Sequence, residues 1–326
     1  MAKRKLKQNL LEVPSIDEDR ADVHLADWAE LTASLNADSN VSTEDLKKAI
    51  QRAGKVSDTR AEAAAISAFN ELEDRQNSCG VNSAGKQLYP FRLDGAKKLL
   101  TSVGVGGPAF IYKFLLCVSA SSMGSTVRTR KNVDPTKAFE RLCADVLASY
   151  WGHPDRGTGV IVFGTARNGK KALTSFSDKI DNLCEDLNEG VGWRKDALAP
   201  RGGDGKVDLV AWRKFADKRR GNLVGFAQCK TGTSWDRTLT EMVPEAFSAT
   251  YMHTRLVLDP FRIFMVPERI SDHRWEESTR LGGLLMDRCR IVEFSNKTSI
   301  AVKRECKVWL DDLIAEQKSI RRMTTN

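Results

Sequence analysis

Three side chains suited to phosphodiester chemistry lie on two neighbouring apolar runs of the chain. Asp208 belongs to the run 207–212, and Gln228 and Lys230 stand at the end of the run 223–229. Both runs have the length and apolar character of buried strands. If they pair side by side, a carboxylate, an amide oxygen and an ammonium meet at one sheet edge. Such a set can hold a divalent cation and orient a water molecule for attack on a phosphate ester.

The phase of the second run adds a further constraint. Gln228 and Lys230 are two residues apart, so in a strand both side chains leave the same face and Cys229 points to the other. An amide inside such an apolar run must find hydrogen-bond partners if it is buried. By contrast, an Asp beside a turn and a Lys at a strand end are common surface residues, and neither alone indicates a site.

These residues resemble the motif of the PD-(D/E)xK nucleases, the restriction-endonuclease-like superfamily. The resemblance is greatest to its Mrr-like branch, in which Gln commonly replaces the second acidic residue. It covers about residues 135–313. It implies that Asp208 and Gln228 bind the metal together with the backbone carbonyl of Cys229, and that Lys230 aligns and activates the nucleophile. A Glu on an upstream helix often completes such sites, and Glu140 in the segment 139–142 matches it.

The resemblance also implies a fold and a function. We expect an α/β fold, a restriction-endonuclease-like mixed sheet flanked by helices, with an N-terminal all-helical domain. The expected activity is Mg²⁺- or Mn²⁺-dependent endonucleolytic hydrolysis of DNA, in restriction or anti-phage defence. An alternative from another class is a nuclease-fold subunit that binds nucleic acid or scaffolds a complex without cutting.

The charge of the chain favours an acidic partner. The formal net charge is +8 and the isoelectric point about 9.1, which makes nucleic acid the expected ligand. Basic side chains flank the Gly-rich approach to Asp208, and two hydroxyls follow Lys230. The predicted DNA contacts are Arg194, Lys195, Arg201, Lys206, Thr231 and Thr233.

Cysteine usage and the N-terminus bear on the compartment. The seven cysteines are scattered and form no Cys-x-x-Cys pair, so neither a disulfide framework nor a zinc site is predicted. The basic first residues are not followed by the apolar stretch of a signal peptide. No apolar run is long enough to span a membrane. We therefore expect a cytoplasmic protein with no membrane partner.

Composition along the chain predicts two folded parts. Residues 1–20 form a charged tail, and 21–120 a helical domain for a protein partner or for target selection. Residues 121–131 form a basic linker, and 132–326 the nuclease domain, which we expect to fold alone. A homo-oligomer is one possibility that the sequence leaves open. Expected helices are 24–36, 43–53, 58–76, 109–120, 135–151, 175–188, 238–251, 272–285 and 300–317. Expected strands are 160–163, 207–212, 223–229, 262–266 and 290–294. The segment 97–103 is expected to be either a short helix or a strand.

One further motif competes for the function. Residues 164–170 match the first seven positions of a nucleotide-binding P-loop, between an expected strand and an expected helix. The eighth position is Lys171 instead of Ser or Thr, so the hydroxyl that would bind Mg²⁺ is missing. ATP binding through Lys170 is therefore the weaker alternative, and a basic turn is the simpler interpretation.

Overall fold

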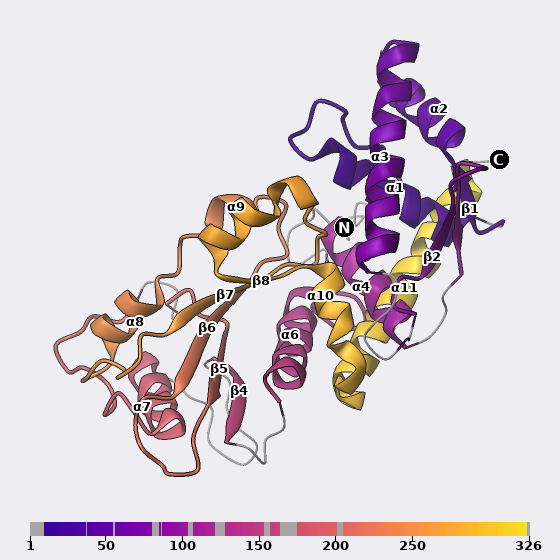
Figure 1. Cartoon of the computed structure of the whole chain (residues 1–326). Coiled ribbons are helices and arrows are strands. Elements are labelled where there is room, and N and C mark those ends of the chain that lie inside the picture. Colours follow the sequence, from indigo (N-terminus) through magenta and orange to yellow (C-terminus); the bar gives the residue numbers. More distant parts are fainter. Residues whose placement is uncertain are drawn as a thin grey trace, which may run out of the picture.

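In a computed structural model, the described part of the chain is mixed α/β and contains two sheets (Figure 1). The structure describes residues 10–324 except 37, 55, 80–84, 86, 104–106, 121–127, 153–156, 164–174 and 201–204. The segment 164–170 and most of the expected linker thus lie outside the described residues. None of the helices in the described part is both long and apolar enough to cross a bilayer.

A mixed five-stranded sheet forms the frame of the C-terminal part, with its strands in chain order. The first three strands pair antiparallel, and the last three pair parallel. The strands are β4 (Thr158–Val162), β5 (Leu209–Arg213), β6 (Leu223–Cys229), β7 (Phe261–Met265) and β8 (Leu284–Met286). Four of them lie where the apolar runs predict strands, with boundaries that agree within two residues. The predicted mixed sheet is confirmed.

Helices cover both faces of this sheet. Helix α6 (Pro135–Trp151) packs on the face that carries Ala227 and Cys229, while α7 (Phe176–Leu187) and α8 (Pro244–Tyr251) pack on the face that carries Phe226. The N-cap of α6 is Asp134, whose side chain accepts a hydrogen bond from the Thr136 N–H, and Pro135 fills the first helical position.

Two predicted helices are wrong in part. Within the stretch 238–251 only α8 is an α-helix, because Pro244 begins it; the short 3₁₀ turn η2 (Trp235–Thr238) ends at the first residue of the stretch, and residues 239–243 are not helical. The stretch 272–285 is α9 (Asp272–Gly282) followed by β8. Gly283, at φ 76°, ends the helix where a Cβ would meet the Arg262 carbonyl oxygen at 2.3 Å.

The predicted strand 290–294 is instead a helix, α10 (Arg288–Glu293). Asp287 caps it: the carboxylate accepts a hydrogen bond from the Arg290 N–H at 3.1 Å. A short apolar run does not by itself distinguish a strand from a buried helical turn, and here the cap decides. The last helix, α11 (Ile300–Thr324), starts where predicted and runs further.

The N-terminal part is not all-helical. It contains α1 (Ala21–Leu35), α2 (Thr43–Ala53), α3 (Asp58–Ser78) and α4 (Pro108–Ala120), and Ser42 and Ser57 cap α2 and α3 as predicted. It also contains an antiparallel sheet in the order β1 (Asn40–Ser42), β3 (Leu99–Ser102), β2 (Phe91–Asp94). Its strands bury Val41, Phe91 and Leu100, and short strands with one buried side chain give little periodic signal.

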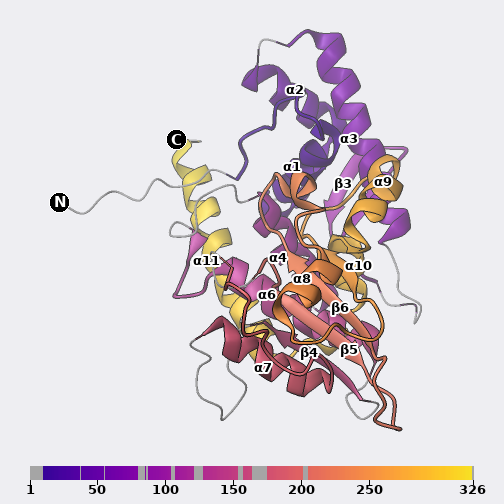
Figure 2. The ribbon, with the colours of Figure 1, turned by 90° about the vertical axis from the view of Figure 1, so that its left-hand side faces the viewer.

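One apolar core continues from the N-terminal part into the five-stranded sheet. It includes Leu25 on α1, Phe114 on α4, Phe139 on α6, Ala227 on β6 and Trp309 on α11. Figures 1 and 2 show α4 and α11 between the N-terminal helices and α6. The predicted boundary at 121–131 stays a prediction, but a fragment 132–326 would expose one side of this core. The shared core therefore argues against independent folding of that fragment.

A buried ionic network crosses the same boundary. Arg288 on α10 donates to both carboxylate oxygens of Asp27 on α1, each at 2.8 Å, and Arg75 on α3 donates to Asp27 at 2.7 Å. Both arginines also lie near Glu30, at 3.4 and 3.1 Å. Burial alone would raise the pKa of Asp27, but the charges of Arg288 and Arg75 outweigh it and hold this pKa well below its usual range.

Removing one member of this network should be costly. We predict that Arg288→Met lowers the free energy of unfolding by about 3–5 kcal/mol, because it leaves the two buried carboxylates of Asp27 and Glu30 to share Arg75 as their one guanidinium partner in the described structure. Denaturant unfolding measures this. The control is Arg280→Met, which removes a surface pair with Glu276 of 77% and 82% exposed side chains, and should cost less than about 1 kcal/mol. Similar losses in both variants would contradict the structural role of Arg288.

A histidine beside the same boundary predicts a pH dependence. Burial opposes ionisation of His24, but its hydrogen bond with Glu268, the charge of Glu268 and a hydrogen bond with Glu18 raise its pKa from 6.5 to about 9. A pKa raised by folding stabilises the protein fully below 6.5, and that contribution is lost as the pH rises towards 9.

Unfolding free energies measured across this range should therefore fall more steeply in the unmodified protein than in His24→Gln. His273→Gln, at an exposed position, should keep the full slope. An unchanged slope in His24→Gln would show that His24 does not titrate in this way.

Candidate functional site

Asp208 is fixed at the start of β5 by a β-bulge. Its N–H donates to the Ala227 carbonyl at 2.9 Å, while Leu209 pairs with that same residue. Two residues opposite one are the mark of a bulge, which re-aims a side chain at a strand end. Its carboxylate accepts a hydrogen bond from the Cys229 N–H at 2.7 Å. The acidic group is thus held against the last residue of β6.

Glu140 is presented to the same region by α6. Its side chain is buried, and Lys137, one turn earlier, donates to both of its oxygens at 3.0 Å. Residues three apart on a helix share a face, so the pair is local. Lys137 itself stays largely exposed, with 61% of its side chain accessible. The site therefore has a buried acid capped by an accessible ammonium.

The carboxylates of Glu140 and Asp208 act on the same neighbours. Burial lowers the pKa of Lys137, but the hydrogen bond to Glu140 and the charges of Glu140 and Asp208 raise it overall. Burial raises the pKa of the Cys143 and Cys229 thiols, which are hydrogen-bonded to each other, and the two carboxylates raise it further. The two acids, one ammonium and two protonated thiols form one cluster on the α6 face of the sheet.

Gln228 lies on the other face of β6. Strand alternation separates it from Cys229, and it pairs in register with Phe264, which faces away from α6. Its side chain is 0% exposed, and neither its amide oxygen nor its amide nitrogen has a hydrogen-bond partner in the described structure. The structure thus does not bring Gln228 together with Glu140, and its role as a ligand stays a prediction.

Lys230 follows β6 at the same sheet edge. Its N–H donates to the Met265 carbonyl at 3.0 Å, and its ammonium lies 3.8 Å from a Glu241 oxygen. Lys206 reaches that oxygen at 2.8 Å. The hydrogen bond from Lys206 and then the charge of Lys230 lower the pKa of Glu241. The Glu241 carboxylate therefore lies close to two of the predicted basic residues, Lys206 and Lys230, beside the sheet edge.

The other predicted DNA contacts are placed less uniformly. Thr231 is buried, and its hydroxyl accepts a hydrogen bond from Arg128 at 3.2 Å and lies 3.5 Å from the Thr136 hydroxyl. Thr233 is exposed, and its carbonyl accepts a hydrogen bond from Arg20. Arg194 donates to the Ala249 carbonyl at 2.6 Å and lies 3.2 Å from Asp196; Lys195 is exposed. Arg201 lies outside the described residues.

Three residues of this neighbourhood were not predicted as part of the site. Lys137 could have been found from its spacing, three residues before Glu140 on a predicted helix. Arg128 belongs to the basic cluster that composition assigns to a linker. Glu241 lies in a loop, and no sequence pattern connects it with Lys206 or Lys230.

The donor set fits a hard divalent cation that keeps part of its water shell. Mg²⁺ commonly binds through one or two carboxylates, with waters and substrate phosphate oxygens completing the octahedron. Glu140 and Asp208 can supply two carboxylates. Within the described residues no group of three or more His, Cys, Asp or Glu side chains is placed to hold a metal. A closed all-protein cage is therefore not formed by these residues.

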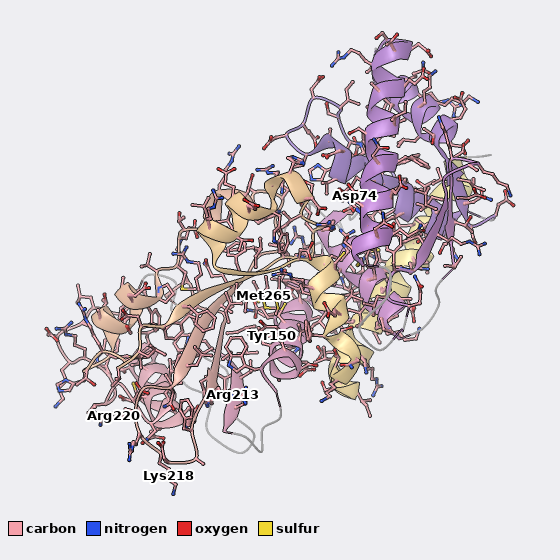
Figure 3. All side chains as sticks on the ribbon, viewed as in Figure 1. Asp74, Tyr150, Arg213, Lys218, Arg220 and Met265 are labelled. Atoms are coloured by element: carbon pink, nitrogen blue, oxygen red, sulfur yellow. The ribbon has the colours of Figure 1, made fainter. Side chains whose placement is uncertain are left out.

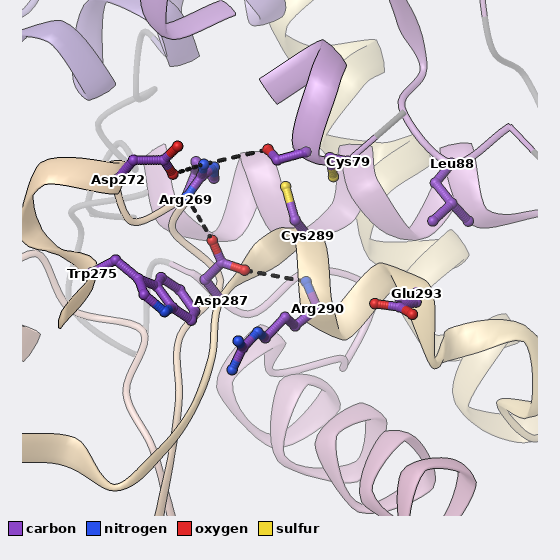
Figure 4. A pocket seen from close by; sticks show the side chains of 10 residues that line it. Cys79, Leu88, Arg269, Asp272, Trp275, Asp287, Cys289, Arg290 and Glu293 are labelled. Carbon is purple, nitrogen blue, oxygen red and sulfur yellow. Dashed lines mark hydrogen bonds and ion pairs between the residues drawn. The ribbon is translucent and has the colours of Figure 1, made fainter. Parts of the chain in front are cut away.

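A pocket of about 420 Å³ lies elsewhere, between the end of α3 and α9–α10 (Figure 4). None of its lining residues belongs to the predicted site. Most of its charged side chains already have a partner: Arg269 contacts Asp272 at 2.7 Å and Asp287 at 3.3 Å, and Arg290 lies over the Trp275 ring at 4.3 Å. These contacts give it a structural explanation.

Comparison with family models, curated proteins and solved structures found no match for this chain.

The Gln228 amide, which has no hydrogen-bond partner among the described residues, leads to a stability prediction. A buried amide without partners costs about 1–3 kcal/mol, so Gln228→Met should leave the free energy of unfolding unchanged or raise it within that range. The matched control is Gln317→Met. Gln317 is equally buried, but it accepts the Leu10 N–H at 3.0 Å, so its replacement should destabilise by about 0.5–1.5 kcal/mol. A clear loss in Gln228→Met would reveal an undetected structural partner.

Proposed function

We propose that the protein is a metal-dependent DNA endonuclease. The observation that carries the proposal is the cluster formed by Glu140 and Asp208 with Lys137, beside the end of β6. The order of elements supports it: a helix with the Glu, an antiparallel pair of strands with the Asp just before the first and the Gln-x-Lys at the end of the second, then a helix and a parallel strand. This order agrees with the restriction-endonuclease-like fold that the sequence resemblance implies.

In this proposal Asp208 and Glu140 would hold Mg²⁺ or Mn²⁺. The cation, when bound, lowers the pKa of a coordinated water and screens charge on the phosphorane. Asp208 is fixed for this task because the Cys229 N–H holds one of its oxygens. Glu140 is freed from Lys137 when the lysine turns to a substrate phosphate, since the lysine side chain is largely exposed and rotates about several bonds.

Lys230 and Lys137 have different roles at the sheet edge. Lys230 orients the attacking water and screens the developing charge, approaching from the face that carries Gln228. Lys137 approaches from the α6 face. Gln228 supplies a neutral oxygen to a water molecule on its own face of the sheet once the edge is occupied by substrate. This role accounts for a buried amide that no described protein atom satisfies.

Phosphate-binding groups flank the edge on both sides. Lys206 and Lys230 meet at Glu241, and Arg128 meets Thr231 and Thr136 beside the start of α6. Guanidinium, ammonium and hydroxyl groups contact phosphate oxygens without reading sequence. A DNA strand lying across the edge would therefore be held before and after the scissile phosphate.

A second function is favoured by one observation. No group of three or more His, Cys, Asp or Glu side chains among the described residues is placed to hold a metal, and the Gln that replaces the second acidic residue is neutral. A subunit that binds nucleic acid or scaffolds a complex without cutting would need no such group. Metal binding and cleavage separate the two functions.

The biological setting is proposed from the resemblance alone. We propose restriction or anti-phage defence in a cytoplasm, with a protein partner or target selected by the N-terminal part. Because that part shares a core with the sheet, a partner bound there would act on the same rigid body that carries the site.

Cleavage assays test the proposal. With Mg²⁺ or Mn²⁺, plasmid, linear or modified DNA should be cut, and chelation should stop the reaction. Asp208→Asn, Glu140→Gln and Lys230→Ala should each lower the rate by about 100-fold or more, since even groups that only support a metal ligand are worth about 10–100-fold. Gln228→Met should also lower it while keeping or gaining stability.

The control is Asp145→Asn, an acid on the same helix that accepts a hydrogen bond from the Ser299 N–H at 2.9 Å. It should keep full activity. Circular dichroism confirms that each variant is folded. Metal-dependent DNA binding without cleavage in the unmodified protein would favour the non-cutting subunit; full activity in Asp208→Asn would reject the site.

A further inference from the structure

We propose that the hairpin between β5 and β6, residues 213–220, is a second docking surface for the backbone of double-stranded DNA. We call this segment the basic hairpin. The proposal shares its partner with the proposed function. It rests, however, on the charges and anchoring of the hairpin and not on the chemistry at Asp208.

The basic hairpin carries a dense and largely unpaired positive charge. Arg213, Lys214, Lys218, Arg219 and Arg220 face a single acid, Asp217. Within the described part of the chain, only Arg219 has an ion pair, 3.8 Å from Asp217 and with 86% of its side chain exposed. Lysine and arginine side chains free of protein carboxylates can neutralise phosphates at little cost, because no internal pair must be broken.

A buried carboxylate holds the base of the hairpin in place. Glu189, 3% exposed, accepts hydrogen bonds from the N–H groups of Gly221 at 2.7 Å, Asn222 at 2.9 Å and Val257 at 3.1 Å. The Asn188 side chain donates to the Lys218 carbonyl at 3.4 Å. The end of α7 thus fixes the backbone that presents these cations. Preorganised charges lose less conformational freedom on binding than those of a free loop.

An aromatic side chain lies among the charges. Phe215 is 67% exposed, in the middle of the basic hairpin. An exposed ring beside phosphate-binding groups can pack against sugars and base edges. This combination distinguishes the hairpin from an ordinary solvated charge run, which has no reason to expose a large apolar group.

The position of the hairpin fits one continuous duplex. Asp208 precedes β5 and Arg213 ends it, so the two lie roughly 17 Å apart at about 3.3 Å per residue. Figure 3 shows Arg213, Lys218 and Arg220 at the end of the sheet away from Met265, which lies beside the site. That span equals about half a turn of B-form DNA, whose full turn is about 34 Å.

Salt-dependent binding tests the proposal. The variant Lys218→Gln/Arg219→Gln/Arg220→Gln is compared with the unmodified chain on a labelled duplex of about three helical turns, by fluorescence anisotropy in EDTA so that no cleavage occurs. Affinity should fall by at least about tenfold. The slope of log affinity against log salt should become shallower by about 2–3, because each phosphate that the protein no longer neutralises lowers the slope by about 0.9.

A matched control removes the same charge elsewhere. Lys48→Gln/Arg52→Gln/Lys97→Gln, at exposed positions of the N-terminal part, should change affinity and slope little. Phe215→Ala should weaken binding without changing the slope. Equal effects of the two triple variants would overturn the proposal and indicate general charge attraction. Loss of binding to phosphatidylserine vesicles, with unchanged DNA binding, would overturn it in favour of a membrane.

The outcomes are separable from those of the cleavage assay. If the unmodified protein binds DNA through the hairpin but never cuts, the proposed function fails and the docking surface stands. If it cuts with Mg²⁺ while the hairpin variant binds normally, the docking surface fails alone.

Discussion

The buried pairing of Arg288 with Asp27 is the contact on which the rest of the arrangement depends. It joins the helix that follows the last sheet strand to the first helix of the chain, and Arg75 joins α3 to the same carboxylate. A buried charge keeps its low energy only while its partners stay in place. The network therefore fixes the position of the N-terminal helices relative to the five-stranded sheet. The core beneath the site, with Phe139 and Ala227, is continuous with the core around this network.

The geometry of the site depends on an irregularity in the sheet, the β-bulge at Asp208. A regular strand would send the side chains of Asp208 and Leu209 to opposite faces. The bulge opposite Ala227 lets Asp208 turn to the α6 face and accept the Cys229 N–H. Gln228 and Lys230 remain in phase with each other on the other face. The proposed chemistry thus needs an edge reached from both sides, with the acids on one side and the amide and lysine on the other.

Sequence patterns predict the parts of this molecule that depend on local contacts. The strand at residues 223–229, the caps at Ser42 and Ser57 and the proline start of α6 follow from periodicity and end residues. Patterns miss what depends on tertiary contacts. The small sheet that buries Val41, Phe91 and Leu100 has strands too short to show an alternating pattern. The run 290–294 is missed for a different, local reason: it is a helix because Asp287, three residues upstream, caps it, and the apolar run hides that signal. Glu140 and Asp208 could be predicted as a pair only through the family resemblance, and Glu241 could not be predicted at all.

The most direct test of the central claim is to locate the metal. Crystals grown or soaked with Mn²⁺ give an anomalous scattering signal whose position is independent of any mechanism. The account predicts one Mn²⁺ between the carboxylates of Glu140 and Asp208, with waters filling the remaining positions, and no signal there in Asp208→Asn. No Mn²⁺ at these carboxylates in the unmodified protein, at concentrations that support DNA cleavage, would contradict it.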